Sequence, residues 1–313
     1  MKTKKCLYCC LPTENNSEYH EKCSVEFYGR AVPPILDFGL DDLSAMATIA
    51  IGDRVSVPGA QSKISLGYAM SDGKQKRMTV VGLWGEYILK PPCEEYPFMP
   101  ENESLTMELA DYFGIQTVPS SLIRLKTGEL AYITKRIDRI GNRKLPMEDT
   151  AQLCGKLTEQ KYAGSLEQVG KVIRQFSSNP GFDLLRFFEL NVFSFLTGNA
   201  DMHLKNFSII LQNGLYGLAP AYDLLSTRLL IPEANDREES ALSMNGKKRK
   251  FNRDDFIKFS ANLGLPEKAV QNSLSFLSQK SETAEKIISK CFLPIESRTL
   301  YSELIRERAG RIV

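Results

Sequence analysis

The chain has 313 residues, of which 42% are hydrophobic and 25% charged, and its formal net charge is +2. A chain of this length favours two lobes or two domains over a single core. The near balance of 40 basic and 38 acidic residues argues against wholesale binding of nucleic acid or membrane, and no apolar run reaches the roughly 18 to 20 residues that cross a bilayer.

Residues 1–30 are predicted to form a cysteine-rich N-terminal tip. No apolar segment follows the basic start MKTKKCLYCC, so no signal peptide is expected. The odd count of seven cysteines is not typical of a secreted disulfide framework and indicates a reducing cytoplasm.

Four residues of this tip have the spacing of a metal site. Cys6, Cys9, His20 and Cys23 read C-x2-C-x10-H-x2-C. Two close pairs of ligands separated by 10 to 15 residues are typical of a tetrahedral structural zinc site, with Cys10 as a bystander. The alternative is a set of reduced cysteines beside an exposed histidine, and the sequence leaves both open.

Residues 31–137 are predicted to form a strand-rich N-lobe. Its first part, residues 31–50, has a short helical pattern. Strands are expected between residues 51 and 90, with a hairpin turn at the SDGK stretch. The apolar spacing of residues 101–114 predicts an amphipathic helix that ends at Gly114. A second hairpin is expected to turn at residues 126–128.

Residues 138–313 are predicted to form a helical C-lobe. The strongly apolar stretch 182–199 predicts a buried helix, and residues 252–265 and 267–291 predict surface helices. Between them, the Asn213-Gly214 pair inside an apolar stretch predicts a third hairpin.

The stretch GNADMHLKNFSII, residues 198–210, carries the clearest functional pattern. Asp201 and Asn206 have the D-x-x-x-x-N spacing of a kinase catalytic loop, where the Asp takes the proton of the acceptor hydroxyl and the Asn holds magnesium. The predicted hairpin would return Asp223 to the neighbourhood of Asn206, and magnesium prefers such oxygen ligands. The alternative is a solvated turn with a capping Asp.

Three stretches of the first half could serve a nucleotide. Lys90 ends the strand-like run YILK, where an inward lysine could hold phosphates; the alternative is an exposed lysine at a strand end. Gly59, with hydroxyls at Ser56 and Ser62, is by motif only a weak phosphate cradle. Residues 134–139 could form a hinge strand that offers backbone groups to adenine.

Six stretches together resemble the HipA-like serine/threonine kinases, the toxins of bacterial toxin–antitoxin modules. In chain order they are SVPGAQSK, YILKPP, ENESLTMELADYFGI, ITKRIDR, GNADMHLKNFSI and LAPAYDLLST, over about residues 55–230. The chain is shorter at its N-terminus than full-length HipA and so is similar to short HipT-type members. The resemblance implies an α+β, two-lobed protein-kinase-like fold that uses ATP and Mg²⁺.

The resemblance also implies roles for single residues. Asp201 is implied as the catalytic base, Asn206 and Asp223 as the metal ligands and Lys90 as the phosphate-binding lysine. Lys135 and Ile137 are implied at the adenine by backbone contacts only. The loop over the phosphates corresponds to Ser56, Val57, Pro58, Gly59, Ala60 and Gln61.

Within this loop, Ser56 matches the serine that the family autophosphorylates. Its phosphate would be repelled by those of ATP, which would expel the loop and switch the kinase off. His203 is expected to brace the catalytic loop. Lys205 either stabilises the transferred phosphoryl group or is merely solvated. Glu103 or Glu108 could pair with Lys90, and the sequence does not choose between them.

The implied partners are a protein substrate such as an aminoacyl-tRNA synthetase, a helix-turn-helix antitoxin of HipB type and a small HipS-like protein. DNA would be reached only through the antitoxin, and the basic run at residues 246–253 could equally be a solvated loop. Two other functions stay open. One is a catalytically weak kinase-fold component of a DNA-bound repressor complex, and the other is a small-molecule kinase of related fold, which the SVPGAQSK loop disfavours.

Overall fold

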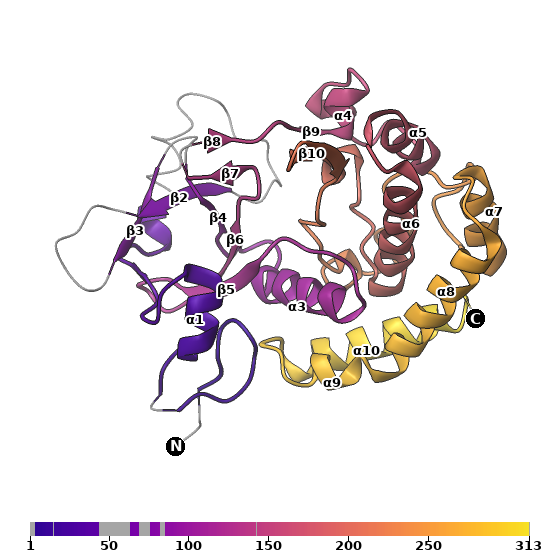
Figure 1. Ribbon diagram of the computed structural model, residues 1–313. Helices are drawn as coiled ribbons and strands as arrows, with labels where there is room; N and C mark the ends of the chain where they lie inside the picture. The colour runs from indigo at the N-terminus through magenta and orange to yellow at the C-terminus, as the bar shows by residue number, and fades with distance from the viewer. Residues whose placement is uncertain are drawn as a thin grey trace. The chain divides into compact units, whose positions relative to one another are not determined.

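The chain folds into two compact units in the computed structural model, which describes residues 4–14, 16–43, 63–68, 76–81, 85–141 and 143–312 (Figure 1). Unit 1 comprises Met1–Ser104, Val118–Arg143 and Lys290–Phe292. Unit 2 comprises Leu105–Thr117, Lys144–Ser289 and Leu293–Val313. Within the described ranges, no helix combines the length and the apolar character that a bilayer crossing requires.

Unit 1 is built on a six-stranded sheet. Its strands are β1 (Ile35–Leu36), β2 (Ile64–Tyr68), β3 (Arg77–Val80), β4 (Tyr87–Lys90), β5 (Ser120–Arg124) and β6 (Leu130–Lys135). They lie in the order β1-β3-β2-β4-β6-β5, and every neighbouring pair is antiparallel except β1 and β3. The strand β5 therefore forms one outer edge of the sheet.

The strand-rich prediction for this part of the chain is confirmed. The β5–β6 hairpin turns where the sequence places it, and Gly128 supplies the positive φ of 107° that the turn requires. β2 and β3 pair as the predicted hairpin does, although its SDGK turn lies outside the described residues.

The core of unit 1 joins the sheet to the N-terminal segment. The helix α1 (Glu21–Tyr28) contributes Phe27 and Tyr28, and the loop before it contributes Leu7 and Tyr19. These side chains pack in one apolar cluster with Leu89 and other residues of the sheet strands. Burial of these aromatic and aliphatic groups is the main favourable term for this unit.

The predicted helix at residues 101–114 is α3 (Met99–Tyr112), and Gly114 follows it with a left-handed φ of 79°. Its interior side chains Leu105, Met107 and Leu109 are buried. Residues up to Ser104 belong to unit 1 and the remainder of the helix to unit 2.

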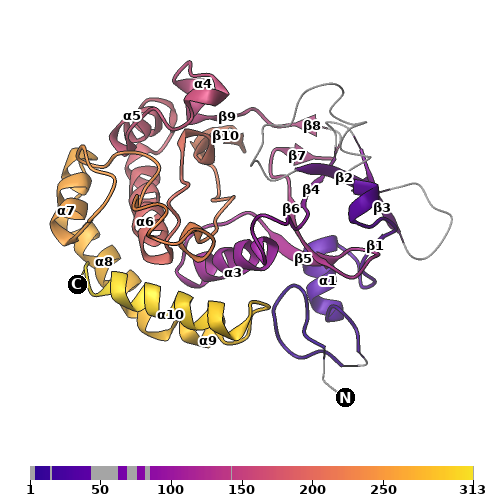
Figure 2. The same cartoon turned by 180° about the vertical axis from the view of Figure 1, so that it is seen from behind.

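Unit 2 is centred on α6 (Pro180–Thr197), the predicted apolar helix. Pro180 occupies its first turn, where a missing N–H is tolerated, and Gly198 ends it with a left-handed φ of 70°. Figures 1 and 2 show α8 and α10 side by side in this unit. The other helices are α4 (Thr150–Leu153), α5 (Leu166–Phe176), α7 (Arg253–Asn262), α8 (Glu267–Thr283), α9 (Glu285–Ile288) and α10 (Ile295–Ala309), with short 3₁₀ turns η1 (Thr158–Gln160), η2 (Leu204–Asn206) and η3 (Thr227–Leu229).

A three-stranded sheet of β9 (Met147–Asp149), β10 (Ser208–Gln212) and β11 (Leu215–Leu218) lies in the same unit. The predicted Asn213-Gly214 turn is confirmed, with φ of 51° and 80° at its two residues. Positive φ at both central positions is typical of the tight turn that suits the twist of a hairpin. The remaining two strands, β7 (Arg139–Ile140) and β8 (Arg143–Lys144), form a separate ribbon.

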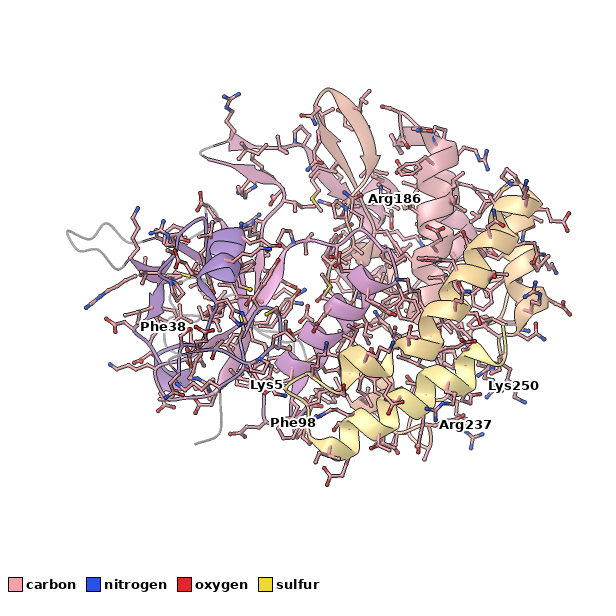
Figure 3. All side chains as sticks on the ribbon, turned by 60° about the horizontal axis from the view of Figure 1, so that its bottom comes forward. Lys5, Phe38, Phe98, Arg186, Arg237 and Lys250 are labelled. Carbon is pink, nitrogen blue, oxygen red and sulfur yellow. The ribbon has the colours of Figure 1, made fainter. Side chains whose placement is uncertain are left out.

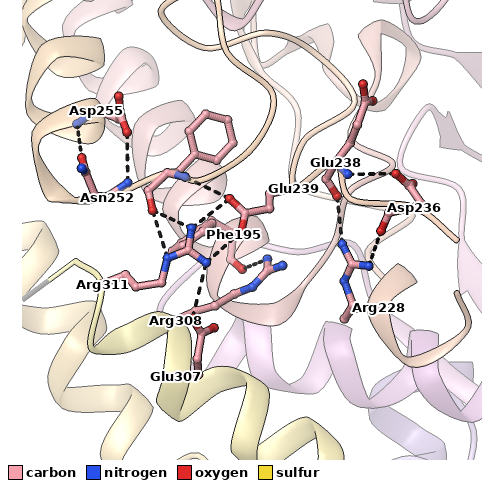
Figure 4. A network of polar contacts seen from close by, with 11 residues as sticks. Phe195, Arg228, Asp236, Glu238, Glu239, Asn252, Asp255, Glu307, Arg308 and Arg311 are labelled. Carbon is pink, nitrogen blue, oxygen red and sulfur yellow. Dashed lines mark hydrogen bonds and ion pairs between the residues drawn. The ribbon is translucent and has the colours of Figure 1, made fainter. Parts of the chain in front are cut away.

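The segment after the β10–β11 hairpin is held by arginine side chains, one of which, Arg311, lies near the end of the chain. Arg311 holds the carboxylate of Glu239 with two nitrogens at 2.8 and 3.0 Å and also donates to the Phe251 carbonyl (Figure 4). A neighbouring set of contacts in Figure 4 has Arg228 donating to the carbonyls of Asp236 and Glu238. Forked arginine contacts of this kind fix backbone position as well as charge.

Candidate active site

The predicted catalytic loop leaves the C-terminal end of α6 and folds back on its own backbone. Asn199 Oδ1 accepts from the Asp201 amide at 3.1 Å, and Asn206 Nδ2 donates to the Asp201 carbonyl at 3.1 Å. Because Nδ2 is used in this way, Asn206 presents its other amide atom, Oδ1, as the group that can bind a cation. Asn206 itself is 5% exposed.

The start of this loop is also held from outside. Thr227 Oγ1 donates to the Gly198 carbonyl at 2.9 Å and accepts from the Ala200 amide at 3.0 Å. Arg228, part of the network in Figure 4, donates its amide to the same Gly198 carbonyl at 3.2 Å. The segment after Asp223 therefore fixes the backbone just before Asp201.

The hairpin returns the chain to the loop, as its turn predicts. The Tyr222 hydroxyl donates to the Lys205 carbonyl at 2.9 Å and pairs with Ser208 Oγ at 2.6 Å. Asp223 is the next residue and has a left-handed φ of 61°, which Asp tolerates better than most residues. Backbone in this sparsely populated region concentrates at functional sites.

The pKa of His203 responds to the charges of both Asp201 and Asp223. Burial lowers the pKa of His203, and the charges of Asp201 and Asp223 act in the opposite direction. Its backbone joins the loop, with its amide 2.8 Å from the Asp201 carbonyl and its carbonyl 2.9 Å from the Asn206 amide. Its ring packs edge-on against Tyr162, with centroids 5.3 Å apart.

The structure adds Tyr162 and Asp149 to the site, two residues that the sequence did not single out. The Tyr162 hydroxyl donates to Asp201 Oδ1 at 2.8 Å, and burial followed by the Asp201 charge raises the pKa of Tyr162. Lys205 Nζ forms an ion pair of 2.7 Å with Asp149 Oδ2, so Lys205 is neither simply solvated nor without a partner. Asp149 had a signal, the capping-box pattern that it forms with Gln152, but Tyr162 had none.

In unit 1, Lys90 is buried at the end of β4. Its Nζ lies 2.5 Å from Glu103 Oε1 and 5.3 Å from the ring centre of Tyr132, and Lys90 and Glu103 are 4% and 1% exposed. The reading of Lys90 as an exposed strand-end residue is therefore wrong. The structure also chooses Glu103 over Glu108 as its partner.

Two other segments are predicted to contact the nucleotide, the loop at residues 56–61 and the hinge at residues 134–139. The loop Ser56, Val57, Pro58, Gly59, Ala60 and Gln61 lies outside the described residues. At the predicted hinge, the amide of Lys135 donates to Pro119 and that of Arg136 to Glu86, both within unit 1. A nucleotide contact in this stretch would therefore use Ile137 or backbone carbonyls.

The predicted zinc ligands lie together in unit 1, with all four ligand atoms within 4.8 Å of one another. They are Cys6, Cys9, His20 and Cys23.

The basic run 246–253 forms a surface turn, where Lys247 pairs with Asp255 and Lys248 with Glu238. Figure 3 shows Lys250 at the exterior of unit 2, on the same side as Arg237. Acidic partners thus neutralise two charges of this run.

Comparison with known proteins gives the chain its relatives. The HipA-like C-terminal domain family matches residues 55–290. A Haemophilus influenzae protein described as a candidate kinase is 31% identical over 269 residues, which are 77% of this chain and 76% of that protein. The Shewanella oneidensis serine/threonine-protein kinase toxin HipA is 28% identical over 196 residues, 55% of this chain and 43% of that protein.

A solved structure agrees with these sequence matches. In the Shewanella oneidensis complex of HipA, HipB and operator DNA, one chain matches with a TM-score of 0.67 and 22% identity over 83% of this chain and 65% of its own length. That likeness shows the fold, which is α+β and protein-kinase-like. Because the family match covers most of the sequence, the chain belongs to the family of HipA-like C-terminal domains.

Proposed function

We propose that this protein is an ATP-dependent serine/threonine kinase that uses Mg²⁺. The observation that carries the proposal is the loop in unit 2, where Asn206 is locked onto the Asp201 backbone and the hairpin pins the residue before Asp223 to Lys205 and Ser208. Asp201 would take the proton of the acceptor hydroxyl. Asn206 Oδ1 and the Asp223 carboxylate would hold the metal, which stabilises charge on the phosphates.

Unit 1 would supply the contacts to the nucleotide phosphates. A lysine needs an acidic partner to stay charged and oriented at low exposure, and Glu103 provides one for Lys90. Residues 56–61 would cover the phosphates, and Ser56 would be the site at which the kinase inactivates itself. The Ile137 backbone would contact adenine. The proposed N-lobe is residues 31–137 and the proposed C-lobe is residues 138–313.

The same proposal extends to the biological role. The protein would be the toxin of a toxin–antitoxin pair that inhibits growth by phosphorylating a translation component such as an aminoacyl-tRNA synthetase. Its partners would be a HipB-like helix-turn-helix antitoxin, through which it would reach DNA, and a small HipS-like protein. The names of the Shewanella relative and of its solved complex support the toxin and antitoxin parts.

Incubation with ATP and Mg²⁺, followed by tandem mass spectrometry, tests the activity. We expect phosphate on Ser56 of the wild-type protein, and none when Mg²⁺ is omitted. The variant Ser56→Ala should stay active for longer because it cannot acquire the inhibitory charge. ATP binding without phosphate transfer to this chain or to any added protein would contradict the proposal and favour the catalytically weak repressor component.

Tyr162 provides a second prediction, because its hydroxyl occupies one of the two Asp201 oxygens that could take the proton of the acceptor hydroxyl. A hydrogen bond to a charged group is worth about 1.5–3 kcal/mol, which corresponds to about 10- to 150-fold in rate, so Tyr162→Phe should raise kcat/KM for the protein substrate by about 10-fold or more. Steady-state kinetics would measure this, with Tyr216→Phe on exposed β11 as the control. A lower kcat at unchanged KM would instead show that Tyr162 orients the base.

A further inference from the structure

Two ligand separations in the Cys/His cluster match those of an occupied zinc centre. His20 Nδ1 lies 3.4 Å from Cys9 Sγ and 3.7 Å from Cys23 Sγ. Zinc bonds of about 2.3 Å to sulfur and about 2.05 Å to nitrogen, at the tetrahedral angle, place these two ligand types about 3.6 Å apart. The two measured separations lie on either side of that value.

The imidazole of His20 is oriented by a second contact. Its Nε2 lies 2.9 Å from the Pro12 carbonyl oxygen. Because a carbonyl only accepts, Nε2 must carry the hydrogen, and Nδ1 then turns its lone pair toward the thiols. Metal-binding histidines are typically oriented in this way by a backbone carbonyl on the other ring nitrogen.

The local backbone brings the four side chains of the cluster together. The Cys10 amide donates to the Cys6 carbonyl at 2.9 Å, and Cys10 has a left-handed φ of 59°, so the chain turns sharply between Cys6 and Cys9. His20 is the residue that precedes α1, without a side-chain capping hydrogen bond, and Cys23 lies in the first turn of that helix. The seven cysteines, all of which the structure describes, form no disulfide.

We infer that Cys6, Cys9, His20 and Cys23 form a closed Cys₃His site for a structural zinc ion. Three thiolates and one imidazole favour a borderline-soft ion with tetrahedral geometry. Four protein ligands leave no position open for substrate, and Cys6 is fully buried while Cys23 is 9% exposed. The site is independent of the proposed kinase activity.

The zinc ion would fasten the N-terminal segment to the outer edge of the unit 1 sheet. Leu7, between the first two ligands, accepts at its carbonyl from the Leu122 amide of β5 at 3.1 Å and from Ser121 Oγ at 3.2 Å. Tyr19, next to His20, donates its hydroxyl to the Leu122 carbonyl. Figure 1 shows this loop beside β5, where it covers backbone groups that an edge strand otherwise exposes.

Metal analysis of protein purified without chelator or histidine tag tests the site. We expect about one zinc per chain, and replacement by Co²⁺ should give the absorption bands of a tetrahedral thiolate centre. Cys9→Ser and Cys23→Ser should lose most of the zinc, whereas Cys10→Ser, the adjacent control, should keep it. Wild-type protein with no zinc and no thiolate–cobalt absorption would overturn the inference even if the variants fail to fold. Loss of zinc from Cys10→Ser would overturn the ligand set.

Hydrogen exchange tests the fastening role. Removal of zinc with a chelator should accelerate amide exchange in residues 118–126, which include β5, and should leave the β10–β11 hairpin of unit 2 unchanged. The melting temperature should fall with it. Unchanged exchange at Leu122 after complete removal of the metal would show that the zinc does not hold this edge.

Discussion

We expect Asp201→Asn to lower the rate of phosphoryl transfer by about 10²- to 10⁴-fold, because an amide cannot take the proton of the acceptor hydroxyl. The loop itself should survive the change. It is held through the amide and carbonyl of Asp201, which contact Asn199 and Asn206, and neither bond involves the carboxylate. The Tyr162 hydroxyl can still donate to the remaining side-chain oxygen. The loss should therefore appear in kcat and not in folding.

Two further variants separate this chemical role from metal binding. Asp223→Ala should weaken Mg²⁺-dependent ATP binding, whereas Asp201→Asn should leave it nearly unchanged. Asp254→Asn, an exposed carboxylate in the first turn of α7, is the matched control and should behave as wild type. Nucleotide titration calorimetry and single-turnover phosphorylation measure the two effects. Equal phosphorylation by wild type and Asp201→Asn would remove Asp201 as the base.

The parts of this site that the sequence predicts are those held by local rules. The turn at Asn213-Gly214 requires positive φ at two adjacent residues, and Asn-Gly satisfies this better than almost any other pair. Once the hairpin is placed, the approach of Asp223 to the catalytic loop follows from its length. The apolar stretch of α6 likewise predicts a buried helix without reference to its neighbours.

The parts that the sequence missed depend on contacts between distant segments. Tyr162 and Asp201 are 39 positions apart, and Tyr162 lies in irregular chain after η1, where no periodicity marks it. The choice between Glu103 and Glu108 failed for a different reason. On a helix of 3.6 residues per turn, five positions correspond to about 140° of rotation, so only one of the two can face Lys90. Which one does so is decided by the packing of α3, and tertiary packing is invisible to a local pattern.

The buried pair of Lys90 and Glu103 leads to the second large effect. We expect Glu103→Gln to lower the free energy of unfolding by about 3–5 kcal/mol, because it removes the carboxylate that pairs with an ammonium group at 4% exposure. Urea denaturation would measure the change. Glu238→Gln, which breaks the exposed pair with Lys248, is the matched control and should have no measurable effect.

A double variant distinguishes the structural role of this pair from its role toward ATP. Replacing both charges by apolar groups of similar size, as in Lys90→Met with Glu103→Leu, should restore most of the lost stability, because no charge is then left buried. Met can also pack on the Tyr132 ring that Lys90 now contacts. The same variant should still fail to bind ATP, since the lysine proposed to contact the phosphates is gone. ATP binding by the stable double variant would exclude Lys90 from the nucleotide site. A double variant as unstable as Glu103→Gln would show that loss of the counter-charge is not what destabilises the single variant.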